Sequence, residues 1–152
     1  MSADVGVPDW HHLPDNPYNP HAWVLGDPRI GTGCWIGAFT VIDGSGGLTI
    51  GNGCDISAGA QIYTHSTVRR TVSARELPIE RAATTIGDCV HVGAGAVILM
   101  GAVIGDHCVI AAGAVVSQFM RVPDWSVVVG VPGVIRPDAA KRYARPVEGR
   151  NV

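Results

Sequence analysis

Branched aliphatic residues recur along this chain at every sixth position. From residue 86 to residue 128 this register holds only isoleucine and valine: Ile86, Val92, Ile98, Ile104, Ile110, Val116, Val122 and Val128. An earlier block keeps the period in two runs separated by a two-residue slip at the letters GGL: Ile30, Ile36 and Ile42, then Ile50, Ile56 and Ile62. A period of six is neither helical nor a simple strand alternation. It is typical of the hexapeptide repeat of a parallel β-helix.

The repeat predicts a single all-β domain over residues 1–152. Three faces of six residues give about 18 residues per coil, and therefore about four and a half coils. We expect a Pro-rich N-terminal cap or arm over residues 1–28, the β-helix over residues 29–136, and a C-terminal tail over residues 137–152. Within this tail the letters PDAAKRYAR predict a short helix, with Asp138 near its start and basic residues towards its end.

Composition agrees with this fold and excludes several classes of protein. The chain has 20 glycines and 47% hydrophobic residues, which argues against both a helical domain and disorder. Its net charge of −2 gives no sign of a nucleic-acid or anionic-membrane surface. The N-terminus lacks the features of a secretory signal, and no apolar run is long enough for a transmembrane helix. We therefore expect a cytoplasmic protein.

The four cysteines fit the repeat better than they fit a reactive site. Cys34, Cys54 and Cys108 occupy the position four residues after the aliphatic one, where the side chain is usually small and is expected to point inward. A buried free thiol there behaves as a small hydrophobe. Cys89 falls one place earlier, near a corner of the coil, and its environment stays open.

One segment interrupts the regular stacking and places a histidine beside the interruption. After Ile62 the next aliphatic position of the regular stack is Ile86, so residues 67–84 are expected to leave the coil as a loop. His65, three places after Ile62, then lies at the corner where this loop departs. Long loops in tightly repeating folds are usually functional or disordered.

The chain resembles the bacterial hexapeptide-repeat acyltransferases, which form left-handed parallel β-helices. The resemblance covers roughly residues 24–136. It is strongest in the letters IGDCVHVGAGAVILMGAVIGDHCVIAAGAVV and in the closing VPDWSVVVGVPGVIRP. The upstream segment that ends in QIYTH is similar to the branch that acylates sugars and nucleotide sugars.

This resemblance implies an enzyme that transfers an acyl group, most simply acetyl from acetyl-CoA, directly to a hydroxyl or amine of a carbohydrate or nucleotide sugar. It implies a homotrimer with acyl-CoA between neighbouring prisms, and no acyl-enzyme. His65 matches the family's catalytic histidine, and an imidazole suits a general base near neutral pH. The alternative for His65 is a corner residue whose ring bonds a neighbouring carbonyl.

Two residues near His65 are weaker candidates for acceptor binding. The family often has an acid directly after the histidine, where this chain has Ser66, so the group that orients the imidazole is open. Asp43 is expected on the same face one coil earlier, and there it would orient the ring or hold an acceptor amine. The other interpretation of Asp43 is turn chemistry within the letters DGSGG.

The resemblance also implies positions for CoA, although two basic residues of the family pattern are missing. Ala94, Ala112 and Ser117 match the small residues that contact CoA. Gln118 stands where a lysine is common, and GVPGVIRP lacks the usual basic residue. Arg121 and Arg136 are candidates to replace these phosphate contacts, with solvated surface charge as the alternative.

The remaining histidines do not predict a metal site. The related gamma carbonic anhydrases hold zinc with three histidines, which requires a closely spaced pair on one edge. His91 and His107 occupy different repeat positions, and His11, His12 and His21 lie in the Pro-rich N-terminal segment. We therefore expect no metal. The rival interpretation from another class is a catalytically silent β-helix that serves as a binding or assembly subunit.

Overall fold

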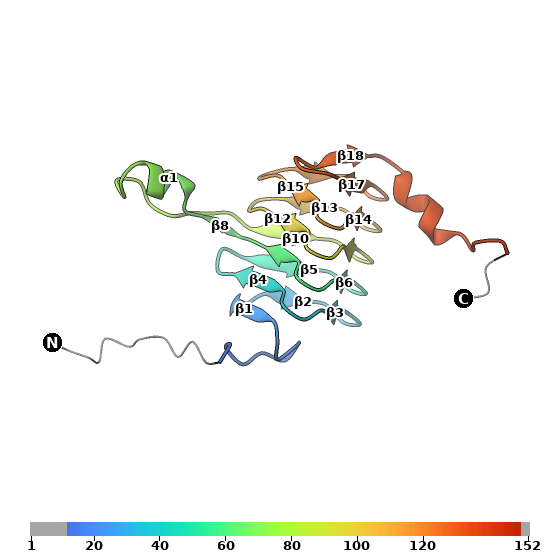
Figure 1. The fold of residues 1–152 in the computed structure, drawn as a ribbon, viewed down its shortest axis with the longest axis horizontal. Helices are drawn as coiled ribbons and strands as arrows, with labels where there is room; N and C mark the ends of the chain where they lie inside the picture. The colour runs from blue at the N-terminus through green and yellow to red at the C-terminus, as the bar shows by residue number, and fades with distance from the viewer. Residues whose placement is uncertain (1–11, 150–152) are drawn as a thin grey trace.

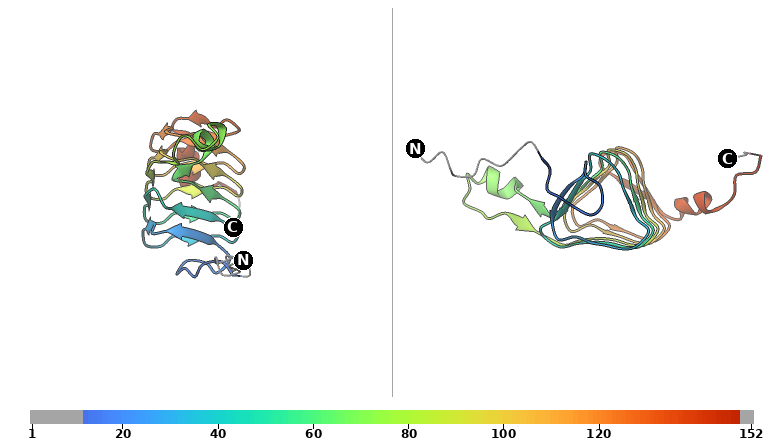
Figure 2. Two further views of the ribbon diagram at one scale, coloured as in Figure 1. Left: turned by 90° about the vertical axis from the view of Figure 1, so that its left-hand side faces the viewer. Right: turned by 90° about the horizontal axis from the view of Figure 1, so that it is seen from below.

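The computed structural model describes residues 12–149, and three parallel sheets wind around a common axis to form a triangular prism (Figures 1 and 2). We call these faces sheets A, B and C. Sheet A contains β1 (Trp23–Gly26), β4 (Val41–Gly44), β7 (Gln61–Ile62), β12 (Val97–Ile98) and β15 (Val115–Val116). Sheet B contains β2 (Arg29–Ile30), β5 (Leu48–Ile50), β10 (Thr84–Ile86), β13 (Val103–Ile104) and β16 (Arg121–Val122). Sheet C contains β3 (Trp35–Ile36), β6 (Asp55–Ile56), β11 (His91–Val92), β14 (Val109–Ile110), β17 (Val127–Val129) and β18 (Val134–Arg136).

The six-residue period appears directly in the strand register. On sheet A, Ile42 pairs with Ile62, Ile62 with Ile98, and Ile98 with Val116. These four side chains are fully buried in the prism interior, whereas the preceding residue of each strand points outward. The parallel β-helix predicted from the sequence is therefore confirmed, with the predicted residues stacked on one face.

The stack is slightly taller than the predicted four and a half coils. Strand β1 pairs in parallel with β4, with Val24 opposite Ile42, so Trp23 already belongs to the first coil. Val24 lies six residues before Ile30 and continues the period. Five coils result, and β18 then pairs antiparallel with β17 and ends sheet C. The first 11 and last three residues, including His11 of the predicted N-terminal cap, lie outside the described part.

The predicted loop has secondary structure of its own, and from here on it is called the arm. It leaves the corner between sheets A and B and extends well away from the prism (Figures 1 and 2). Strands β8 (His65–Ser66) and β9 (Glu80–Arg81) pair antiparallel at its base, and α1 (Val68–Val72) lies near its tip. None of the residues of α1 is buried. His65 is therefore the first residue of the arm.

The predicted C-terminal helix forms as a 3-10 helix, η1 (Ala139–Ala144). It lies beside the corner between sheets B and C, at the opposite vertex of the prism from the arm (Figure 2). The amide of Ala140 donates to the carbonyl of Trp125 at 2.9 Å, and Ala140 is buried. Asp138 forms an ion pair with Lys141 at 2.7 Å. No helix among residues 12–149 is long and apolar enough to cross a membrane.

The repeat predicted inward positions for three cysteines, and full burial is observed for two of them. Cys54 and Cys108 are buried, Cys34 is half-buried, and Cys89 is exposed at a corner with a positive φ of 55°. Burial raises the pKa of Cys54 to about 11 and also raises the pKa of Cys108. Thiolate is the reactive form, so these two buried thiols are inert near neutral pH.

Candidate active site

The His65 ring is held against the prism by a carboxylate from the preceding coil. Asp43, in β4, is fully buried, and its Oδ2 lies 2.5 Å from Nδ1 of His65. The His65 side chain remains 29% exposed, so its ring keeps access to solvent. Asp43 also caps the turn that follows it, because its Oδ1 accepts from the amide of Ser45 at 3.0 Å. The two sequence interpretations of Asp43, turn chemistry and contact with the ring, therefore hold together.

The Asp43 carboxylate makes its hydrogen bonds to neighbouring residues of the prism and the arm. This carboxylate is fully buried, and its oxygens bond Ser45, Thr64 and His65. These partners place the carboxylate against the His65 ring, as the first of the two expected roles of Asp43 requires, and the second role, acceptor binding, stays a prediction.

The electrostatics of this pair fix which ring nitrogen is available. Burial alone would raise the pKa of Asp43, but hydrogen bonds from Ser45, Thr64 and His65 outweigh it and hold that pKa well below its ordinary value. An ionised carboxylate only accepts hydrogen bonds, so Nδ1 of His65 must be the donor. The lone pair of neutral His65 is then on Nε2, the nitrogen that does not face Asp43.

The contacts of Ser66 lie within the arm, and the residue that contacts the His65 ring is Asp43. Its Oγ accepts from the amide of Val68 at 3.3 Å, and its backbone lies opposite Glu80 in the β8–β9 pair. Oε1 of Glu80 in turn lies 3.7 Å from Nη1 of Arg69. The missing acid after the histidine is thus supplied from Asp43, a residue 22 positions earlier.

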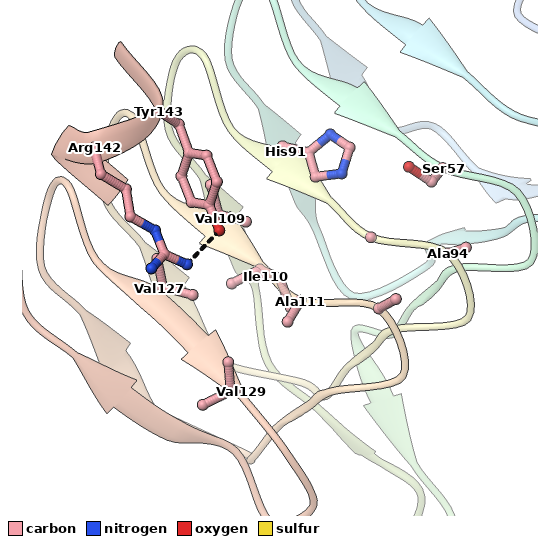
Figure 3. Close-up of a pocket in the computed structure, with 12 residues that line it drawn as sticks. Ser57, His91, Ala94, Val109, Ile110, Ala111, Val127, Val129, Arg142 and Tyr143 are labelled. Carbon is pink, nitrogen blue, oxygen red and sulfur yellow. Dashed lines mark hydrogen bonds between the residues drawn. The ribbon is translucent and has the colours of Figure 1, made fainter. Parts of the chain in front are cut away.

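A second candidate region is a groove on the outer face of sheet C, with a volume of about 700 Å³ (Figure 3). Apolar side chains of β14 and β17 form its floor, and residues of η1 form one wall. Ala94 and Ala112, two of the predicted CoA contacts, line it. They occupy equivalent corners of successive coils, between sheets C and A, where the amide of Gly113 donates to the carbonyl of Ala94 at 2.9 Å.

The other three predicted CoA residues do not line this groove. Ser117 directly follows β15 and therefore lies at the corner between sheets A and B, below which His65 emerges. Arg121 is exposed on sheet B, and Arg136 is exposed on β18. The structure thus places the two alanines at the corner between sheets C and A and Ser117 at the corner between sheets A and B, with Arg121 on sheet B and Arg136 on sheet C.

Two residues at the groove were missed by sequence reasoning. Arg142 and Tyr143 of η1 both line it, and an Nη of Arg142 donates to the Tyr143 hydroxyl at 2.6 Å (Figure 3). The Arg142 guanidinium also lies 4.7 Å from the centre of the Tyr143 ring. The basic residues of this segment were visible in the sequence, but nothing in the repeat indicates where η1 docks.

The histidines of the described chain do not assemble into a metal site. His91 and His107 both line a small cavity of about 230 Å³ beside η1, but the His107 ring stacks on Trp125 at 4.2 Å. Among residues 12–149 no group of three or more His, Cys, Asp or Glu side chains is arranged to hold a metal ion. His65 lies at a different vertex of the prism.

Two family models and several known proteins match this chain in sequence. The model of the bacterial transferase hexapeptide (six repeats) matches residues 83–118, and that of the hexapeptide repeat of succinyl-transferase matches residues 29–64. A serine acetyltransferase of Staphylococcus xylosus is 33% identical over 124 residues, which are 82% of this chain and 55% of that protein. The mitochondrial gamma carbonic anhydrase 2 of Arabidopsis thaliana is 31% identical over 123 residues, 74% of this chain and 44% of that protein. The chain therefore spans about half the length of these curated relatives.

Solved structures agree with the fold. An N-acyltransferase from Bacillus cereus, AntD, in complex with dTDP-4-amino-4,6-dideoxyglucose and coenzyme A, superposes with a TM-score of 0.68 at 19% identity, covering 84% of this chain and 74% of that one. A maltose O-acetyltransferase from Clostridium difficile 630 gives 0.56 at 25% identity, covering 74% and 64%. These superpositions show the same fold, and the repeat in the sequence with the two matching family models places the chain among the hexapeptide-repeat proteins.

Proposed function

We propose that this protein is an acyl-CoA-dependent acyltransferase, in which His65 is the general base for direct transfer of an acetyl group to a hydroxyl or amine of a carbohydrate or nucleotide sugar. The observation that carries the proposal is the contact between Nδ1 of His65 and the buried carboxylate of Asp43. This contact presents Nε2 as the proton acceptor on a ring that still reaches solvent.

The proposed reaction needs no covalent enzyme intermediate. Nε2 of His65 takes the proton from the acceptor hydroxyl or amine as its oxygen or nitrogen attacks the thioester carbonyl carbon. The carbon–sulfur bond then breaks, and the departing CoA thiolate takes the proton back from the imidazolium. Asp43 stays ionised throughout and holds the ring in one tautomer.

A homotrimer accounts for the separation of the CoA positions. Ala94 and Ala112 lie at one end of sheet A, and Ser117 lies at the other end with the His65 corner. The outward positions of sheet A are mostly apolar, and Val41, Val97 and Val115 are only half-buried in the single chain. If this face packs between copies, one copy's His65 corner meets its neighbour's small-residue corner, and acyl-CoA binds at that boundary.

The acceptor class rests on two supports. The letters that end in QIYTH are similar to the sugar-acylating branch of the family, and a maltose O-acetyltransferase is among the structures that this chain matches. Serine acetyltransferases also match in sequence, so serine belongs in the same acceptor panel.

The rival is a catalytically silent β-helix subunit, and it has a specific observation in its favour. Arg121 and Arg136, the expected substitutes for the missing phosphate contacts, both lie outside the groove. Arg142, which lines it, is the remaining basic candidate on this surface.

The test is acetyl-CoA-dependent thiol release by the purified protein with a panel of sugars, nucleotide sugars, amino sugars and serine. The expected result is release that depends on one acceptor class. Thermal unfolding with acetyl-CoA at 100 times its dissociation constant should show about 2.7 kcal/mol of stabilisation. If no acceptor gives a rate and millimolar acetyl-CoA causes no shift in stability, the enzyme is contradicted and the silent subunit is favoured.

A further inference from the structure

The residue directly before His65 is a buried polar residue at a position that is otherwise apolar or open. Thr64 is fully buried. The equivalent residue one coil later is Met100, also buried, and two coils later it is Gln118, which is exposed. A buried hydroxyl must be hydrogen-bonded to avoid a large desolvation cost, so its partners identify what it serves.

The carbonyl of Thr64 accepts from the amide of Ala82 at 3.0 Å, whereas the partners of its amide and hydroxyl belong to Asp43 and the turn that follows it. Its amide donates to Oδ2 of Asp43 at 2.9 Å. Its Oγ1 lies 2.9 Å from the Asp43 carbonyl oxygen and 3.1 Å from Oδ2, and its single proton serves one of these acceptors at a time. The same Oγ1 accepts from the amide of Gly46 at 2.8 Å. The hydroxyl thus joins the turn after β4 to the carboxylate that holds His65.

The turn that reaches Thr64 is the two-residue slip seen in the sequence. The extra residues in the letters DGSGG let the backbone leave the regular coil and press onto Thr64. A Cβ on Gly46 would lie 2.2 Å from the carbonyl oxygen of Thr64, so only glycine allows this approach without a backbone shift. The slip therefore delivers the amide that fixes the hydroxyl.

We infer that Thr64 is a positioning residue for the His65 base and acts through Asp43. The hydroxyl and amide of Thr64 fix the plane of the Asp43 carboxylate, and this carboxylate fixes the ring and tautomer of His65. The inference rests on the proposed function for its kinetic consequence, but its structural consequence, the Nδ1–H tautomer of His65, is independent of activity.

The test compares Thr64→Val, which removes the hydroxyl at nearly constant volume, with Thr64→Ser, which keeps it. We expect Thr64→Val to lower kcat about tenfold, the lower end of the loss seen when an orienting partner is removed, and to leave KM for acetyl-CoA within about twofold. Thr64→Ser should restore kcat to within about threefold of the wild-type value.

Nitrogen-15 NMR of the His65 ring supplies the readout that a merely structural role would not change. The wild-type protein and Thr64→Ser should show the Nδ1–H tautomer, and Thr64→Val a mixture of both tautomers. A folded Thr64→Val protein with the wild-type tautomer and kcat would overturn the inference. If Thr64→Val does not fold, Thr64→Ala, which also lacks the hydroxyl, is measured by the same criteria.

These outcomes separate the inference from the proposed function. An inactive wild-type protein contradicts the proposed function, whereas the tautomer measurement on the same protein still decides the role of Thr64. A catalytically active protein whose tautomer and kcat do not respond to loss of the hydroxyl contradicts only the role of Thr64.

Discussion

The corner between sheets A and B recurs in successive coils. The strand before it stacks in the same way each time, but the side chains at the corner differ. Ile62, Ile98 and Val116 are stacked and equally buried beneath it. In the coil of Ile62 the next residues are Tyr63, Thr64 and His65, and the chain leaves as the arm. One coil later they are Leu99, Met100 and Gly101, and two coils later Ser117, Gln118 and Phe119.

The difference between these corners separates architecture from chemistry. In the later coils the corner closes on itself, and the Phe119 ring lies so near Gly101 that a Cβ there would be 2.3 Å from it. In the coil of His65 the corner carries a buried polar cluster, in which Asp43 and Thr64 form hydrogen bonds with each other and with the residues around them. The repeat therefore provides a rigid scaffold, and departures from the repeat provide the functional groups.

The largest expected effect is on activity from the loss of His65. His65→Ala should lower kcat/KM at least about 100-fold, the usual contribution of a general base, while the protein stays folded. His21→Ala is the matched control, because His21 is exposed and lines neither of the two cavities described above, and it should keep the rate within about threefold. Equal losses in the two variants, measured by thiol release, would remove the distinction between the corners.

Replacement of the carboxylate should affect activity and stability together. Asp43→Asn should lower kcat about 10- to 100-fold, because an amide does not fix the Nδ1–H tautomer. It should also cost roughly 1–3 kcal/mol, because a buried donor loses its acceptor.

The stability cost of Asp43→Asn should depend on pH with a defined sign. The pKa of Asp43 in the folded protein lies below its ordinary value near 3.8, so the unfolded state binds more protons in this range. The stabilisation from ionised Asp43 is full above about pH 4 and is lost as pH falls further. The difference in unfolding free energy between wild type and Asp43→Asn should therefore shrink below pH 4. A difference that grows on acidification would show that Asp43 is not a stabilised carboxylate.

Removal of core volume should affect the scaffold without changing the chemistry. Ile86→Ala should lower the free energy of unfolding by about 2–5 kcal/mol, because it leaves a cavity in the prism interior. Thr85→Ala, the exposed neighbour on the same strand, should stay within about 0.5 kcal/mol. Chemical denaturation measures both, and the rate per folded molecule should be unchanged. A loss of kcat in folded Ile86→Ala would show that the scaffold and the site are not separable.

The smallest expected effect comes from the exposed thiol. Cys89→Ser should leave the rate within about twofold, because direct transfer requires no cysteine nucleophile. Mass spectrometry after brief treatment with a thiol reagent should find Cys89 labelled first, and Cys54 and Cys108 protected by burial and raised pKa. Loss of activity in Cys89→Ser would require a different mechanism.

The sequence predicted the scaffold well because the period acts through local rules. Each Ile or Val of the register packs on its equivalent one coil away, so the faces and the corner of His65 followed from counting. Strand β1, which begins the first coil, was missed although Val24 continues the period, because the Pro-rich surroundings obscured it. The positions of Asp43 and His65 on one face were predicted, but their contact depends on how the arm leaves the corner. The docking of Arg142 and Tyr143 could not be predicted, since η1 follows no repeat and is placed by tertiary contacts such as that of Ala140 with Trp125.

The most direct test of the central claim is a crystal structure of the protein with acetyl-CoA bound. If His65 is the base for direct transfer, the thioester carbon should lie within about 6 Å of Nε2 of a His65 ring, from the same or a neighbouring copy. This span accommodates one hydrogen bond of about 2.6–3.2 Å to the acceptor and an attack distance of about 3–3.5 Å. A thioester held in the sheet C groove, far from every His65 in the assembly, would contradict the account.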